Sequence, residues 1–167
     1  LLKQVPNQPL YGGLIEDPLV FYTLNEFMKD NDYSWPLLFP MTKTAYKAMD
    51  AVQEFATKEL DQQINRFLIS GMSKRGLTTW LTGTLQDQRV EAIAPMVIDL
   101  LNIPVSLNYQ HQLYGGFSEG LQEYINPKMM QDKEFMDAVV QMLDPYSYRD
   151  KLTMPKLIFM GTNDPYW

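Results

Sequence analysis

The segment that most constrains this chain is residues 67–80, where an apolar run ends at a glycine, presents one serine and continues with helical spacing. A strand, a tight turn and a helix in this order are typical of a nucleophile elbow, in which the serine side chain is exposed above a sheet. Gly71 and Gly76 supply the room that such a turn needs. The segment therefore predicts Ser73 as a nucleophile, and the alternative is an ordinary serine that caps the helix.

The elbow departs from the usual Gly-x-Ser-x-Gly pattern. Arg75 stands two residues after the serine, and the second glycine comes one place later. A formal match exists at Gly116-Phe117-Ser118-Glu119-Gly120, but a polar and aromatic stretch precedes it and no clear helix start follows. A motif counts only in its predicted structural setting, so Ser118 is the weaker candidate.

Composition excludes several classes of function. The 14 basic and 20 acidic residues give a net charge of -6 and form no long runs, which argues against nucleic-acid or anionic-membrane partners. The chain has no cysteine, so disulfides, thiolate metal sites and a cysteine nucleophile are excluded. No apolar run approaches the roughly 18 residues of a membrane helix. We expect no integral membrane segment, no metal and no cofactor; the oligomeric state stays open.

Apolar spacing predicts alternating strands and helices, which indicate an α/β fold with parallel strands and crossover helices. No Gly-x-Gly-x-x-Gly or Walker-type lysine follows any strand, which opposes a nucleotide-binding doubly wound domain. The predicted helices are residues 18–30, 42–60 with Thr42 as the N-cap, and 74–85. The predicted strands are residues 67–70, 90–98 and 156–160, with residues 1–5 as the tail of an earlier strand.

Residues 102–150 interrupt this alternation. The segment is polar, aromatic and rich in methionine, with a helix start at Asn126-Pro127 and a stop at Asp144-Pro145. It predicts a helical insertion over the sheet, a lid in which the methionines fill gaps in the packing. The whole chain, residues 1–167, is then one domain or part of one.

Two carboxylates are candidates for the acid that would orient a catalytic histidine. Reacting groups collect at the carboxyl ends of parallel strands, and Ser73 and Asp164 both follow such ends. Asp99, after the second strand, is the alternative acid. The single histidine, His111, lies in the insertion and ahead of Asp164, which is the wrong position for the base of an α/β-hydrolase triad.

Several strings of residues together resemble the PhoPQ-activated pathogenicity-related protein family, over essentially the whole chain. They are Pro6-Asn7-Gln8-Pro9-Leu10, Trp35-Pro36-Leu37, Pro40-Met41-Thr42-Lys43, Ala48-Met49-Asp50-Ala51-Val52-Gln53, Gly71-x-Ser73-Lys74-Arg75-Gly76-x-Thr78-Thr79-Trp80, Ile98-Asp99-x-Leu101-Asn102 and Asp144-Pro145-Tyr146-Ser147-Tyr148-Arg149. The resemblance implies an α/β-hydrolase fold related to serine peptidases and esterases, and export from the cell as a secreted or periplasmic protein.

The resemblance also implies that the chain is an internal part of a longer protein. It would begin at the fourth core strand and end just past the seventh, so the base histidine and half of the oxyanion hole would lie outside it. The remaining oxyanion donor would be the backbone N–H of Lys74. We therefore expect the isolated chain to be unstable or inactive, and residues 1–5 to lack the strand beside them.

These expectations leave two functions open. The first is a serine hydrolase that attacks an ester or amide bond of a small-molecule or peptide substrate through Ser73, with Asp164 orienting the histidine. The second is a secreted signalling or binding protein that retains the fold without catalysis, since the family includes an autocrine proliferation repressor. Lys74 and Arg75 beside the serine either bind a substrate anion or lie on the first helical turn, with Arg75 paired to a nearby acid.

Overall fold

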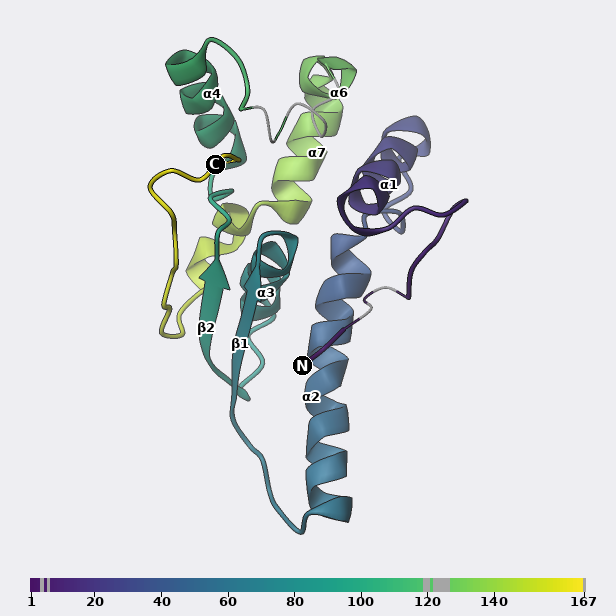
Figure 1. The fold of residues 1–167 in the computed structure, drawn as a ribbon, viewed down its shortest axis with the longest axis vertical. Coiled ribbons are helices and arrows are strands. Elements are labelled where there is room, and N and C mark those ends of the chain that lie inside the picture. Colours follow the sequence, from purple (N-terminus) through teal and green to yellow (C-terminus); the bar gives the residue numbers. More distant parts are fainter. Residues whose placement is uncertain (4, 6, 119–120, 122–126, 167) are drawn as a thin grey trace.

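The computed structural model describes residues 1–3, 5, 7–118, 121 and 127–166 (Figure 1). Its described part is a mixed α/β structure with a small parallel sheet and several helices. In chain order the elements are α1 (Glu16–Asp30), α2 (Leu38–Glu59), β1 (Phe67–Met72), α3 (Lys74–Thr84), β2 (Val90–Met96), α4 (Ile103–Tyr114), α6 (Pro127–Gln131), α7 (Lys133–Leu143) and the 3-10 helix η1 (Pro145–Lys151).

The centre of the structure is the unit β1–α3–β2. The two strands are parallel and in register from Leu68↔Ala92 to Met72↔Met96, which confirms the predicted strand, helix and strand. β2 ends at Met96, two residues earlier than predicted, because Val97 turns the backbone to φ 44°, which a strand does not tolerate.

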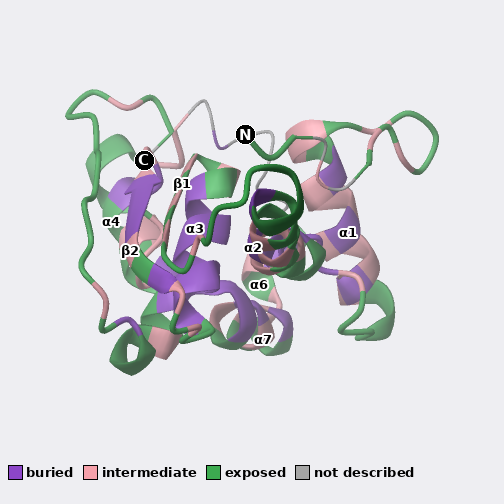
Figure 2. Ribbon diagram, turned by 90° about the horizontal axis from the view of Figure 1, so that it is seen from below, coloured by how far each residue is buried: buried purple, intermediate pink, exposed green. Residues whose placement is uncertain are grey.

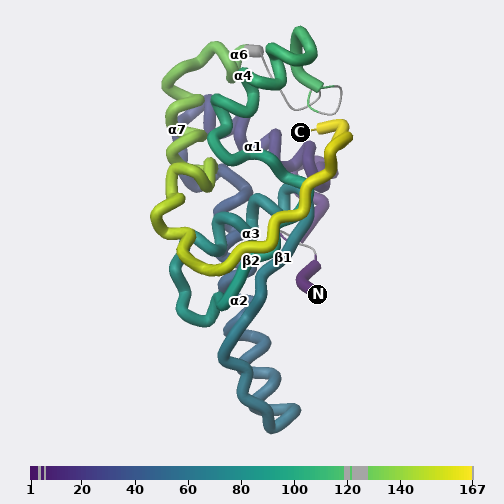
Figure 3. Tube along the Cα trace, turned by 90° about the vertical axis from the view of Figure 1, so that its left-hand side faces the viewer, coloured from purple at the N-terminus to yellow at the C-terminus, as the bar shows by residue number. Residues whose placement is uncertain are grey.

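The predicted third strand lies alongside β2 in parallel, but it pairs through isolated bridges. The bridges are Ile93↔Lys156 and Met96↔Phe159, and the Val97 N–H donates to the Phe159 carbonyl at 2.8 Å. Figure 3 shows this C-terminal segment, in yellow, running next to β2. Met72, Met96 and Phe159 are thus neighbours across the sheet, and the residues that follow them share one end of it.

Helices cover one face of the sheet. α3 packs on both strands, and the buried residues concentrate between the strands and the helices α3 and α7 (Figure 2). β1 alternates half-buried and exposed positions, so Leu68 is 64% exposed and Met72 is 59% exposed on the opposite face. The face of β1 that carries Leu68 and Met72 is therefore not covered by a helix in the described part of the chain.

Helix α2 begins earlier than the sequence predicts. Its N-cap is Leu37 and its first residue is Leu38, so Thr42 is not the N-cap. The Thr42 hydroxyl instead donates to the Leu38 carbonyl at 2.8 Å inside the helix. The sequence signal is ambiguous, because Pro40 is as typical of a loop as of a first helical turn, where a backbone N–H would have no intrahelical partner in any case.

The segment before α1 is not a strand in its described residues. Residues 1–3 have no regular structure, and Leu1 and Leu2 are exposed. The expected strand tail is therefore wrong for this structure, and the physical reason is the one expected: a strand without a neighbour leaves its backbone groups unpaired.

Asp144 joins the helices that follow β2. Its carboxylate is 1% exposed and accepts hydrogen bonds from the N–H groups of Asn102 (3.1 Å), Ile103 (2.8 Å) and Tyr146 (2.9 Å). It therefore caps α4 and η1 together, directly after the end of α7. The sequence predicted a helix stop at Asp144-Pro145, but it did not predict that the same carboxylate holds α4.

A second long-range tie fixes α2 against the start of β2. The Arg89 guanidinium donates to Asp50 Oδ1 and to Gln53 Oε1, each at 2.7 Å, and it also binds Asp87. These carboxylates raise the pKa of Arg89 above its ordinary value, with Asp87 contributing most. The ion pair orients α2 beside the sheet.

Asp144→Ala in the full-length protein should lower the free energy of unfolding by about 3 kcal/mol, because one buried and two partly buried N–H donors lose their acceptor. Urea denaturation measures the change. Asp132→Ala is the matched control: Asp132 caps α7 through one bond, from Phe135 N–H at 3.0 Å, and should cost about 1 kcal/mol. Equal costs for the two variants would contradict the role assigned to Asp144.

Candidate functional site

Ser73 occupies the turn between β1 and α3 in a conformation that few non-glycine residues adopt. Its backbone has φ 53° and ψ −124°. The Ser73 N–H donates to the Met96 carbonyl at 3.0 Å, and the Ser73 carbonyl accepts from the Leu77 N–H at 3.0 Å. The side chain is exposed and makes no capping hydrogen bond, so Ser73 is not an ordinary helix-cap serine.

The two glycines of the elbow lie where no side chain fits. A Cβ at Gly71 would come within 2.5 Å of the Arg75 carbonyl oxygen, and a Cβ at Gly76 within 2.6 Å of Ile98 Cγ2 and 2.7 Å of the Met96 oxygen. The glycine one place later than the usual pattern is thus required by the approach of α3 to the end of β2. Arg75, at the usual glycine position, directs its side chain to Glu16.

The Ser73 side of the elbow borders an apolar cavity of about 380 Å³. Its walls come from α1, α2, α3, α4, α6 and α7 and from the residues after β2. Ser73, Lys74, Asp17 and Tyr166 are the lining residues with polar side chains, and the others are hydrophobic. An exposed hydroxyl at the wall of an apolar cavity can approach a carbonyl whose substituent enters that cavity.

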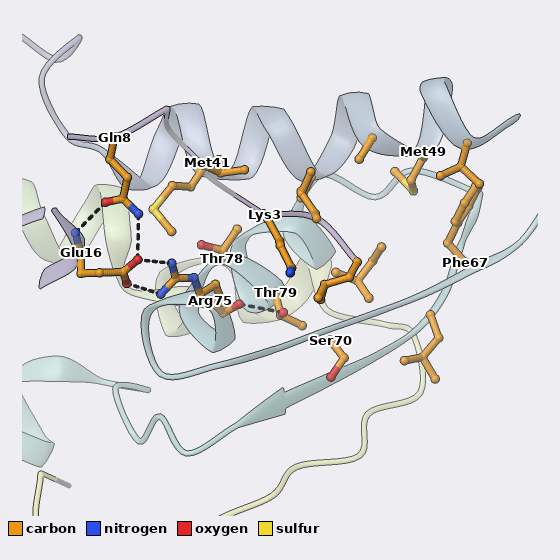
Figure 4. Close-up of a pocket in the computed structure, with 18 residues that line it drawn as sticks. Lys3, Gln8, Glu16, Met41, Met49, Phe67, Ser70, Arg75, Thr78 and Thr79 are labelled. Atoms are coloured by element: carbon orange, nitrogen blue, oxygen red, sulfur yellow. Dashed lines mark hydrogen bonds and ion pairs between the residues drawn. The ribbon is translucent and has the colours of Figure 1, made fainter. Parts of the chain in front are cut away.

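The two cations after Ser73 are paired with acids at the start of α1. Lys74 Nζ lies 2.6 Å from Glu16 Oε2 and 2.8 Å from Asp17 Oδ1, and Arg75 binds both oxygens of Glu16. Gln8 completes the network: its side-chain NH2 donates to Glu16 Oε1 at 2.8 Å, and its Oε1 accepts from the Glu16 backbone N–H at 2.7 Å (Figure 4). The expected pairing of Arg75 with an acid is confirmed. Since Lys74 and Arg75 are both paired with carboxylates, neither is free to bind a substrate anion.

These pairs shift the ionisation of the groups involved. The hydrogen bonds from Arg75, and then from Lys74, hold the pKa of Glu16 well below its ordinary value. The same contact raises the pKa of Arg75. The sequence did not predict the pairing of Lys74 with these acids. Two acids begin one helix and two cations begin another, but the paired residues are 57–59 positions apart in the chain.

The candidate acids follow the same end of the sheet as Ser73. Asp164 comes after the bridged segment and accepts a hydrogen bond from the Tyr166 N–H at 2.8 Å, and Tyr166 lines the Ser73 cavity. Asp99 follows β2 and is exposed, with no hydrogen bond or ion pair to a described residue. The backbone N–H of Lys74, at the first position of α3, has no intrahelical acceptor.

Neither His111 nor Ser118 lines the cavity beside Ser73. His111 is exposed on α4, where its ring packs edge-on against Phe117 at 5.9 Å, and it does not line the Ser73 cavity. The Ser118 hydroxyl donates to the Tyr166 carbonyl at 2.9 Å, and its residue follows α4 rather than a strand. Glu119 and Gly120, the rest of that motif, lie outside the described residues.

A larger cavity, of about 560 Å³, lies between α2, α3 and β1 and does not include Ser73 (Figure 4). Its hydroxyl groups already bind the backbone: Ser70 donates to the Ala94 carbonyl, Thr78 to Lys74 and Thr79 to Arg75. These hydroxyl groups are engaged in hydrogen bonds to the backbone of a strand or a helix, whereas Ser73 is exposed in a turn. The cavity of about 380 Å³ beside Ser73 is therefore the candidate site.

Two kinds of feature are absent from the described ranges. Those residues hold no group of three or more histidine or acidic side chains that could bind a metal ion. None of the helices described is both long and apolar enough to cross a bilayer.

Comparison with known proteins agrees with the resemblance read from the motifs. The family described as PhoPQ-activated pathogenicity-related protein matches residues 1–167. The chain belongs to this family. It is also 38% identical over 174 aligned positions to autocrine proliferation repressor protein A of Dictyostelium discoideum, and the alignment covers 99% of the chain and 35% of that relative. The chain thus spans about a third of its relative's length, and no solved structure matches it.

Gly76→Ala should lower the free energy of unfolding by about 1–3 kcal/mol, because the added methyl group collides with the Met96 oxygen and Ile98. Gly83→Ala, in the same helix, is the matched control. Its nearest contacts are the side-chain methyls Leu152 Cδ2 at 3.2 Å and Ile93 Cδ1 at 3.3 Å. Helix propensity favours alanine by about 1 kcal/mol and offsets that contact. Thermal unfolding of both variants would contradict this view if Gly76→Ala were as stable as Gly83→Ala.

The network around Glu16 should give stability that depends on pH. Because the folded-state pKa of Glu16 is lowered, its contribution is complete above the unfolded pKa of about 4.3 and declines as the pH falls below it. Glu16→Gln should cost about 1 kcal/mol at pH 7, since the pairs are partly solvent-exposed. Denaturant titrations at pH 7, 4 and 3 should show this cost shrinking with acid. A cost that is constant across pH would exclude the ion pairs as its cause.

Proposed function

We propose that this chain carries the nucleophile of a serine hydrolase of the α/β-hydrolase class. The observation that supports it most is Ser73 itself: a serine at φ 53° and ψ −124° between a parallel strand and a helix, exposed at the wall of an apolar cavity. A strained strand-to-helix turn is the setting in which a serine serves as nucleophile. The backbone strain argues for a function, because such conformations persist where the surroundings enforce them.

In the proposed reaction, the Ser73 Oγ attacks the carbonyl carbon of an ester or amide while a histidine takes its proton. Asp164 would fix the tautomer of that histidine and stabilise the imidazolium. Asp99 is the alternative acid. The histidine would come from the protein outside these 167 residues, and it would return the proton to the leaving group. Water would then hydrolyse the acyl-enzyme and release Ser73.

The negative oxygen formed in this attack needs hydrogen-bond donors. The Lys74 N–H at the first position of α3 is the proposed donor, and the positive end of the helix dipole adds to its effect. The Lys74 side chain is not free to take this role, because Glu16 and Asp17 hold its ammonium group. We assign the second donor to the part of the protein outside this chain.

The domain organisation belongs to the same proposal. Residues 1–167 would form part of one α/β-hydrolase domain, and residues 102–150, with α4, α6 and α7, would be the lid inserted after β2. These helices supply walls of the Ser73 cavity, which is the place where a lid acts. The protein would act outside the cytoplasm, secreted or periplasmic, on a small-molecule or peptide substrate.

A second function rests on the relative. Its name describes an autocrine repressor of proliferation, so a secreted signalling or binding protein that keeps the fold without catalysis is the alternative. His111, which does not line the Ser73 cavity, gives this alternative its structural argument, because no described residue serves as the base.

Fluorophosphonate labelling of the full-length protein separates the two functions. An activated Ser73 should label, and Ser73→Ala should reduce labelling to background. Ser118→Ala is the matched control, since it removes the serine of the formal motif and should leave labelling unchanged. A well-folded protein that does not label would contradict the hydrolase and support the signalling alternative.

A further inference from the structure

The cavity beside Ser73 has apolar walls and no unpaired charge among its described lining residues. Its ionic members are Lys74 and Asp17, and they are bound to each other at 2.8 Å. Glu16 and Arg75 complete a set of two cations and two carboxylates, whose charges balance. A charged group entering the cavity would lose its hydration without gaining a free partner, which is unfavourable.

The volume of the cavity fits a small organic group. Its 380 Å³ is more than twice the roughly 150 Å³ of an apolar cavity that holds benzene, and it lies within the range of ordinary ligand pockets. Part of the wall consists of Met129, Met130 and Met136, whose unbranched side chains adapt to different shapes. The walls therefore favour an apolar group without requiring one particular shape.

Ser73, the proposed nucleophile, is part of the cavity wall, so a group bound in the cavity lies next to the bond that Ser73 would attack. Ser73 and Leu77 line the cavity from the elbow and α3, whereas Leu107 lines it from α4. A group that fills the cavity would hold the adjoining carbonyl next to the Ser73 hydroxyl, and this arrangement is the positioning that accelerates a bimolecular step.

We propose that this cavity binds an uncharged apolar group, aliphatic or aromatic, on the acyl side of the carbonyl that Ser73 attacks. This inference rests on the proposed hydrolase function, because Ser73 alone relates the cavity to a scissile bond. The group is either a fatty acyl chain or an apolar amino-acid side chain, which share the same chemistry. Leu107 is then a residue that determines specificity.

The first test measures labelling rates of the full-length protein with alkyl fluorophosphonates from ethyl to dodecyl. The rate should rise with chain length, by up to about fourfold per methylene, until the cavity is filled. Leu107→Trp should remove the dependence on chain length while the ethyl probe still labels. Leu113→Trp is the matched control: Leu113 is on the same helix, 58% exposed and outside the cavity, and its substitution should change nothing.

A second pair of probes distinguishes the two sources of the apolar group. Diphenyl phosphonate analogues of leucine and lysine differ mainly in the charge of the side chain. Labelling by the leucine analogue, with little by the lysine analogue, would assign an apolar side chain of a peptide. Labelling by long alkyl probes alone would assign a fatty acyl chain. Equal labelling by leucine and lysine analogues would overturn the inference.

The outcomes separate failure of the inference from failure of the hydrolase function. If the ethyl probe labels Ser73 and longer chains bring no increase, the inference is wrong and the hydrolase stands. If no probe labels, the hydrolase is wrong, and binding of the neutral dye 1-aminoanthracene to Ser73→Ala protein then tests the cavity alone. Dye binding that is lost in Leu107→Trp would leave an apolar site but overturn its assignment to a substrate.

Discussion

Parallel pairing of β1 with β2 places the ends of both strands at one edge of the molecule, and the rest of the chain is arranged around that edge. The hydrogen bond from the Ser73 N–H to the Met96 carbonyl continues this pairing past the last residue of β1. It holds the serine backbone in its strained conformation with positive φ and lets α3 begin at the next residue. Gly76 then permits α3 to pass within contact of Met96 and Ile98.

The elbow could be predicted from sequence because its sequence signals are local, although Met96 and Ile98 help to shape it. An apolar run, two glycines and a helical spacing lie within residues 67–80, and the structure has β1 and α3 close to the predicted limits. α1 and α7 could be predicted for the same reason. Pro18 marks the first turn of α1, and Asp144-Pro145 marks the end of α7. Local patterns of this kind need no knowledge of distant residues.

The remaining features depend on residues far apart in the chain. Asp144 caps α4 from 41 and 42 positions away, and Arg89 reaches Asp50 from 39 positions away. No spacing rule relates such residues, so the sequence presents Asp144 as a helix stop alone. The cavity beside Ser73 could not be predicted either, since its walls come from six of the described helices. The predicted start of α2 was wrong for a different reason, because Pro40 is typical of both a loop and a first helical turn.

The carboxylate of Asp144 sets how the helices around the cavity can move. It holds the first turn of α4 and the start of η1 in one buried cluster of hydrogen bonds, while Tyr114 at the other end of α4 is exposed. Sliding α4 along its axis would strip the carboxylate of its donors, whereas swinging α4 about its first turn would keep them. Asp144 therefore fixes the first turn of α4, and the bond from the Gln110 amide to the Tyr166 carbonyl at 2.6 Å ties the far half of the helix to the cavity wall.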